Sequence, residues 1–258
     1  MILRALLALA AVWLAAAADP PAGPVLFILA HPDDEIIVAP LIAGLARRGV
    51  PALLTLVTAG ERGAPADGSI AAGPGLGAIR RIEATCSAAA LGIGAPIFLG
   101  LEDGSLGEGV RPPDSRLRGL AAAIAALIAE QRPRAIVTWG PEGGYGHPDH
   151  RLVGAVVSGV VLGSADGPPL LYPGLPADAL AAHPPRMIAW SGVDRTLLTT
   201  VVAFTAADAA ASRTAALCHH SQFASPAIVD ALIADLEPVM AGAVHLRPAR
   251  ALTGDPFP

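Results

Sequence analysis

The sequence predicts a single α/β domain in which helices cover both faces of a mostly parallel β-sheet. Short continuous apolar runs alternate along the chain with segments of helical periodicity, as is typical of parallel strands buried on both faces. The length of 258 residues, less a short N-terminal leader, suits one domain with a sizeable core. In such sheets, ligands bind where the loops after the strands meet, at the carboxyl edge.

The alternation is clearest in the first two-thirds of the chain. Apolar runs predict buried strands at residues 25–30, 52–58, 95–99 and 135–139. Helical periodicity follows each run, at residues 37–48, 77–91, 115–131 and 148–162. Gly49 and Gly92 are the stop signals of the first two helices. The Gly-, Ala- and Pro-rich stretch 59–75 is expected to be a loop.

The remainder of the chain is less regular. Its Pro- and Gly-rich stretch 163–185 is expected to be a loop. Short strands are predicted at residues 187–190 and 197–204, and helices at residues 206–219 and 226–240.

The N-terminus has the layout of a secretory signal peptide. Arg4 is followed by an apolar stretch and then by small residues before Asp19. The apolar stretch falls short of the roughly 20 residues that a spanning helix needs, which disfavours an uncleaved anchor. We therefore expect residues 1–18 to be removed, residues 19–258 to form one domain, and the protein to be periplasmic or secreted. Pro and Gly interrupt every other apolar run, so no membrane span is expected after cleavage.

Charge and cysteine content narrow the possible functions. The net charge is −5, Lys and Arg form no cluster, and aromatic residues make up 4% of the chain. A nucleic-acid partner is not expected, because binding one requires a basic footprint. Cys86 and Cys218 lack the spacing of a metal site. Both lie in apolar, helix-like segments, and the sequence leaves open whether they pair or remain buried thiols. The oligomeric state is also left open.

Two similar motifs follow two of the predicted strands. AHPDDE comes after the first strand and GHPDH after the fourth, more than a hundred residues later. His31 and Asp34 are three residues apart, and His147 and His150 repeat that spacing. Imidazole and carboxylate are zinc ligands, and a catalytic zinc site has three protein ligands and one open position. Three of these four residues would complete such a site.

A metal site would explain why charges concentrate in AHPDDE. Zinc lowers the pKa of bound water towards neutrality, and Asp33 or Glu35 could then act as general base. One such motif alone would be weak evidence, because an aspartate at a helix start often caps the helix. Two motifs at the same edge of the sheet favour the metal site. Iron(II) could also occupy a site of two histidines and one aspartate.

Together these motifs resemble the PIG-L (LmbE-like) family of zinc-dependent N-deacetylases, which includes deacetylases of N-acetylglucosaminyl-inositol compounds. Four further segments are similar to the family: TAGERG, RRIEATCSAAALG, LEDGSL and CHHSQ. With the two motifs they extend the resemblance over residues 25–222. The resemblance implies a Rossmann-like three-layer α/β fold with a mostly parallel sheet and the active site at its carboxyl edge.

The resemblance also implies a metal-ligand set and catalytic roles. His31, Asp34 and His150 would bind zinc, and Asp33 would deprotonate the bound water. His147 would act near the oxyanion, as general acid or as electrostatic stabiliser.

Three further residues match family positions that face the substrate. Tyr145 would help to polarise the substrate carbonyl, and Arg80 and Asp103 would contact sugar hydroxyls. Glu35 is expected to support the ligands or the helix N-terminus rather than to act in catalysis.

The implied reaction is hydrolysis of an N-acetyl group from an N-acetylglucosamine-type amino sugar or glycoconjugate, so the expected partner is a small-molecule or saccharide substrate. One alternative is an exported zinc amidase acting on a larger acyl group or a thiol conjugate. A non-catalytic carbohydrate-binding protein would be expected to lose Asp33 or a ligand. A dinucleotide site is excluded because GPGLGA lacks the third glycine, where Arg80 stands. A Ser-His-Asp hydrolase is excluded because the sequence has no G-x-S-x-G elbow.

Overall fold

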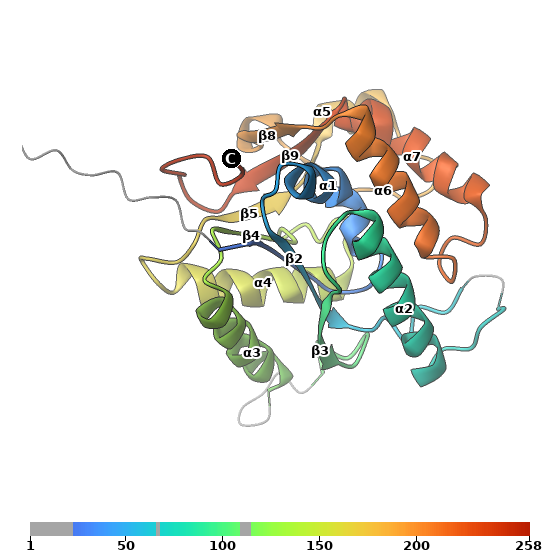
Figure 1. The fold of residues 1–258 in the computed structure, drawn as a ribbon, viewed down its shortest axis with the longest axis horizontal. Helices are drawn as coiled ribbons and strands as arrows, with labels where there is room; N and C mark the ends of the chain where they lie inside the picture. The colour runs from blue at the N-terminus through green and yellow to red at the C-terminus, as the bar shows by residue number, and fades with distance from the viewer. Residues whose placement is uncertain (1–22, 66–67, 109–114) are drawn as a thin grey trace, which may run out of the picture.

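A seven-stranded sheet forms the centre of the fold in the computed structural model, which describes residues 23–65, 68–108 and 115–258 (Figure 1). The strand order is β3-β2-β1-β4-β5-β9-β8. The first five of these strands run parallel, while β9 is antiparallel to both β5 and β8. Their bounds are β1 Val25–Leu29, β2 Ala52–Thr58, β3 Ile97–Leu101, β4 Ala135–Thr138, β5 Leu170–Pro173, β8 Thr200–Ala203 and β9 Ala243–Pro248. The predicted mostly parallel α/β fold is therefore confirmed.

Helices cover both faces of this sheet. They are α1 Ala39–Arg47, α2 Pro74–Ala90, α3 Arg116–Gln131, α4 Pro148–Leu162, α5 Ala177–Ala182, α6 Ala206–Cys218 and α7 Pro226–Met240. Alternate residues of β1 point to opposite faces, and each face has its own apolar core. Phe27 packs with residues of α1, α2, α6 and α7, whereas Ile28 packs with residues of α3 and α4. The protein therefore has three layers, and α3 and α4 lie side by side in one of the two helical layers (Figure 1).

The first two-thirds of the chain follow the predicted alternation closely. Strand β2 and helix α4 have the predicted bounds, as does α7 further along the chain, and β3 lies two residues further on than predicted. The predicted helix 37–48 is preceded by a 3-10 turn, η1 (Asp34–Val38), and α1 starts only at Ala39. Pro40 lies in the first turn of α1, where its fixed φ suits a helix start and its missing N–H has no cost.

The C-terminal third differs from the prediction. The stretch 163–185, expected to be a loop, contains β5, the two-residue strand β6 (Leu175–Pro176) and α5, while β9 was not predicted. The strand predicted at residues 187–190 is absent from the described structure. The backbone N–H groups of Arg186 and Met187 instead donate to the Asp235 carboxylate of α7, at 2.7 and 2.9 Å. Tertiary partners outweigh local propensity in these short segments.

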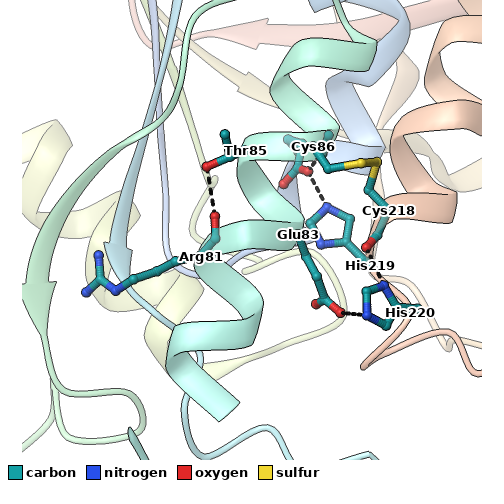
Figure 2. Close-up of a disulfide and its surroundings, with 9 residues drawn as sticks. Arg81, Glu83, Thr85, Cys86, Cys218, His219 and His220 are labelled. Carbon is teal, nitrogen blue, oxygen red and sulfur yellow. Dashed lines mark hydrogen bonds and ion pairs between the residues drawn. A yellow bond between two sulfur atoms is a disulfide. The ribbon is translucent and has the colours of Figure 1, made fainter. Parts of the chain in front are cut away.

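Cys86 and Cys218 form a disulfide, which settles the alternative that the sequence left open. The bond joins α2 to the last residue of α6 across 132 positions of sequence (Figure 2). The proposed signal peptide, residues 1–18, lies outside the described residues. Within the described ranges no helix is long and apolar enough to cross a membrane.

Candidate metal centre and active site

Three ligand-type atoms from the two predicted motifs converge at the carboxyl edge of the sheet. Oδ1 of Asp34 lies 3.0 Å from Nε2 of His150, and that nitrogen lies 3.3 Å from Nδ1 of His31. The third side of the triangle, from His31 Nδ1 to Asp34 Oδ1, is 3.7 Å. Bonds of 2.0–2.2 Å in a tetrahedron place ligand atoms about 3.4 Å apart. The donor set therefore fits one zinc-sized cation without rearrangement.

Each of these three candidate ligands is oriented by hydrogen bonds on the side away from the triangle. Oδ2 of Asp34 accepts bonds from the backbone N–H groups of Ala30 and His31 and from Nε1 of Trp139, at 2.9–3.0 Å, which leaves Oδ1 facing the other ligands. Nδ1 of His150 donates to the carbonyl oxygen of Gly143 at 3.2 Å, which leaves Nε2 free to bind. Such outer hydrogen bonds fix the tautomer and the ring orientation of metal-binding histidines.

His31 is oriented by two carboxylates. Its Nε2 donates to Asp103 at 3.1 Å and to Asp149 at 3.4 Å, and Asp149 also accepts a bond from the backbone N–H of Gly104. Burial raises the pKa of Asp103, but the hydrogen bond and the charge of His31, the N–H of Arg62 and the charge of Arg80 together lower it to about 2. Asp149 was missed by sequence reasoning, although it stands beside His150 in GHPDH. Only the folded structure shows that it contacts His31, 118 positions away.

Asp33 has a left-handed backbone with a φ of 92°, which is rare for a residue other than glycine. Its N–H donates to Oε2 of Glu35 at 3.0 Å, and its Oδ2 accepts a bond from Arg80 at 2.9 Å. Burial raises the pKa of the Asp33 carboxyl to about 6, against the opposing effect of Arg80. Positive φ in a non-glycine residue costs about 1–3 kcal/mol and persists where the surroundings enforce it, most often at functional sites.

Glu35 is fully buried behind Asp33. Its Oε1 accepts bonds from Ser87 Oγ at 2.5 Å and from His219 Nε2 at 2.6 Å. Ser87 and His219 each directly follow one of the bridged cysteines, Cys86 and Cys218. The disulfide therefore holds together the two segments that support Glu35, and Figure 2 shows His219 beside the bond. His219 lies in the segment CHHSQ, but the family resemblance implied no role for it.

Arg80 and Asp103, expected to contact a sugar, have partners inside the protein. Arg80 is 3% exposed and donates to the carbonyl oxygens of Gly60 and Pro32 as well as to Asp33. Asp103 is 6% exposed and supports His31. The geometry shows both side chains orienting neighbouring site residues. Their contact with a sugar stays a prediction.

His147 and Tyr145 lie on the open side of the ligand triangle. The ring of His147 lies 4.8 Å from that of His31, and its Nδ1 accepts a bond from the backbone N–H of Asp149 at 3.2 Å. Burial and the neighbouring histidines lower the pKa of His147, which favours a neutral ring at pH 7. Tyr145 is 43% exposed, and its ring meets that of His150 edge-on at 5.3 Å. Burial and the nearby aspartates raise the pKa of Tyr145, so its hydroxyl remains a donor.

A cavity of about 160 Å³ opens beside these residues. Its polar lining residues are Asp33, Asp34, Tyr145, His150 and Gln222. The rest of its lining is apolar, with contributions from η1, α7 and the irregular segment that holds Ile188 and Trp190. The molecule thus combines a buried site of two histidines and one carboxylate, suited to a divalent cation, with an adjoining substrate-sized cavity. These features define an α/β protein with a metal-type active site at the carboxyl edge of its sheet.

Solved structures share the whole fold. The N,N'-diacetylchitobiose deacetylase from Pyrococcus horikoshii superposes with a TM-score of 0.64 and 20% identity, covering 88% of this chain and 83% of that one. The 4-carboxy-2-hydroxymuconate hydratase GalB from Pseudomonas putida KT2440 gives a TM-score of 0.60 and 16% identity, covering 90% and 98%. These two proteins carry out different reactions, and at such identities the likeness shows the fold alone.

Sequence comparison identifies the family. The family model described as GlcNAc-PI de-N-acetylase (PIG-L) matches residues 26–161, more than half of the chain. The 1D-myo-inositol 2-acetamido-2-deoxy-alpha-D-glucopyranoside deacetylase of Mycobacterium sp. (strain KMS) is 36% identical over 140 residues. The match covers 48% of this chain and 46% of the relative, so the chain spans about half the length of the relative it matches. The chain belongs to the PIG-L family, which confirms the resemblance found in its sequence.

Proposed function

We propose that the protein is a metal-dependent N-deacetylase that hydrolyses the N-acetyl group of an N-acetylglucosamine-type amino sugar or glycoconjugate. The observation that carries the proposal is the triangle of His31, Asp34 and His150, with the carboxylate of Asp33 beside it. Family membership supports the reaction class. The mycobacterial relative is named as a deacetylase of an N-acetylated sugar compound, which supports the substrate class.

We infer that the cation is zinc. Two imidazole nitrogens and one carboxylate oxygen form a common catalytic zinc set, and the buried ligands have their outer hydrogen bonds in place. Bound zinc would polarise the amide carbonyl and lower the pKa of water to near neutrality. Iron(II) suits the same donors, so metal analysis of the purified protein decides between them.

The remaining chemistry falls to the residues around the triangle. Asp33, fixed by Arg80, accepts the proton of the attacking water, and its raised pKa of about 6 lets it return that proton to the leaving nitrogen. His147 and Tyr145 lie on the open side, where a donor can stabilise negative charge on the carbonyl oxygen. An amide resists hydrolysis because its oxygen must carry charge and its nitrogen leaves poorly, and these residues address both barriers.

We also propose that the protein is exported. The layout of residues 1–18 is the first argument. The Cys86–Cys218 disulfide is a second and independent one, because such bonds persist in oxidising compartments and are rare in the cytosol.

Paired substitutions of the adjacent aspartates test the reaction and the assigned roles. Asp33→Asn should keep the metal but lower turnover by about 10²–10⁴, the usual loss for a general base. Asp34→Asn should release the metal, because Oδ1 is a ligand atom. Metal content by mass spectrometry and acetate release from N-acetylglucosamine and its oligomers are the measurements. Equal loss of metal in both variants would contradict the assignment.

A simple aliphatic acetamide serves as the control substrate. If it is hydrolysed as fast as the sugars, the protein is a metal amidase without sugar specificity. If neither substrate releases acetate from the metal-loaded protein, the proposed deacetylase activity is wrong.

A further inference from the structure

The cavity beside the ligand triangle is much more apolar than an acetyl group requires. Apart from the site residues and Gln222, its walls are large aliphatic and aromatic side chains, including Ile36, Ile37, Phe223, Leu232 and Leu236. Leu232 and Leu236 of α7 are 3% and 5% exposed, so they form a packed wall. An apolar cavity of this composition favours an apolar occupant.

A continuous aromatic surface links this cavity to the metal-type site. The Trp139 ring stacks on that of His150, with centroids 4.3 Å apart and an angle of 3°. The Tyr145 ring lies 5.3 Å from His150 and 5.8 Å from Trp190. A group bound to the reacting carbonyl carbon therefore meets these aromatic rings as it enters the cavity.

The surroundings of His31 behind the triangle are polar and buried. There His31 turns its Nε2 to Asp103 and Asp149, and the Asp103 carboxylate also accepts a bond from the backbone N–H of Arg62. An amide bound at the triangle has one substituent on its carbonyl carbon and one on its nitrogen, and these two substituents extend in opposite directions. The apolar cavity suits the acyl group, and the sugar on the amide nitrogen would then extend away from the cavity.

The size of the cavity sets the size of that acyl group. An apolar cavity of about 150 Å³ holds a molecule the size of benzene, and the cavity here is about 160 Å³. Part of this volume lies against Asp33, Asp34 and His150, where the amide itself would lie, and the single methyl of an acetyl group would leave much of the apolar remainder unused. We propose that the preferred substrate is an amino sugar whose nitrogen carries an apolar acyl group of about four to six carbons, or an aromatic acyl group, rather than acetyl. This inference rests on the proposed amide hydrolysis and specifies the acyl group that is removed.

The test uses glucosamine acylated on nitrogen with acetyl, butanoyl, hexanoyl or decanoyl groups, and it measures release of free amine by the metal-loaded wild-type protein. Each buried methylene adds about 0.8 kcal/mol of transfer free energy, or about fourfold in kcat/KM. We expect hexanoyl to exceed acetyl by about two hundredfold on that basis, with no further gain for decanoyl once the cavity is filled.

Narrowing the cavity provides a second readout. Ile188→Trp should reduce the ratio of kcat/KM for hexanoyl over acetyl by at least tenfold. Ile82→Trp is the matched control, because Ile82 is 71% exposed on α2 and does not line the cavity. That control should leave the ratio unchanged.

The outcomes separate this inference from the proposed function. If acetyl is hydrolysed at least as well as every longer acyl group, the acyl inference is overturned and the deacetylase stands. If kcat/KM rises instead with the length of an alkyl group at the glycosidic position of N-acetylglucosamine, the cavity holds the aglycone and the inference is likewise overturned. If no N-acylated sugar releases an amine, both conclusions fail together.

Discussion

Removal of the disulfide should destabilise the protein strongly and also lower its catalytic rate. The bond closes a loop of 132 positions, and the chain-entropy relation assigns about 5 kcal/mol at 25 °C to a loop of that length, with 2–4 kcal/mol more typical of measured values. Since domains are stable by only about 5–15 kcal/mol, the loss is a large fraction of the total. We therefore expect the Cys86→Ala/Cys218→Ala variant to unfold at a much lower urea concentration.

The assay is urea unfolding followed by circular dichroism, with and without reductant. Cys86 is exposed, so reductant should reach the bond and shift the wild-type midpoint to that of the double variant. The double variant is its own control, because reductant should not change its midpoint. Equal midpoints for the oxidised wild type and the double variant would refute the reasoning.

Activity provides a second and more local readout of the same bond. Ser87 and His219, each next to a bridged cysteine, both donate to Oε1 of Glu35, whose other oxygen holds the backbone of Asp33. We expect the double variant, assayed where it is still folded, to keep its metal and its KM but to have a lower kcat. An unchanged kcat would show that the network holds Glu35 without help from the disulfide.

Other properties are testable independently. His150→Ala should abolish metal binding and activity while the circular dichroism spectrum stays unchanged. Full metal occupancy in this variant would exclude His150 as a ligand. A hydrogen bond from Arg47 lowers the pKa of buried Asp208 from its ordinary 3.8 to about 2. The ionised Asp208 carboxylate, which also accepts bonds from Thr205, should therefore contribute up to about 2 kcal/mol of stability above pH 4, and this contribution is lost as the pH falls towards 2. Asp208→Asn should remove both the contribution and its pH dependence in urea titrations. Protein exported by cells should begin at Asp19, and N-terminal sequencing that finds Met1 on exported material would contradict cleavage.

The convergence of the two motifs could be predicted from the sequence, whereas the choice of His31, Asp34 and His150 as ligands came from the family resemblance and stays a prediction. His31 and Asp34 follow one buried strand and His150 follows another, and parallel strands bring their carboxyl ends to one edge. The spacing within each motif then keeps the side chains together. These features depend on chain order and strand direction, which apolar periodicity reveals.

The supporting residues could not be found in this way. Asp149 contacts His31 and His219 contacts Glu35 through pairings set by the packing of α4 and of the segment after α6. The same limit applies to the C-terminal strands, since β9 pairs with β5 and β8 only through long-range contacts. A sequence pattern does not indicate which distant side chain will form a hydrogen bond with a given site residue.

The side chains of the three consecutive acidic residues in AHPDDE point towards three different sets of partners. This arrangement explains how three carboxylates can be adjacent in the sequence. Asp34 turns one oxygen to His150 and His31, Asp33 pairs with Arg80 beside the open side, and Glu35 points back to His219. Each carboxylate therefore has a separate cationic or proton-donating partner, which offsets the cost of placing adjacent charges in a buried turn. A regular helix would rotate the three side chains by fixed steps of about 100°. The left-handed backbone at Asp33 instead lets the successive carboxylates point in different directions. The strained backbone therefore occurs where the proposed base, Asp33, is separated from the proposed ligand, Asp34, and from the supporting Glu35.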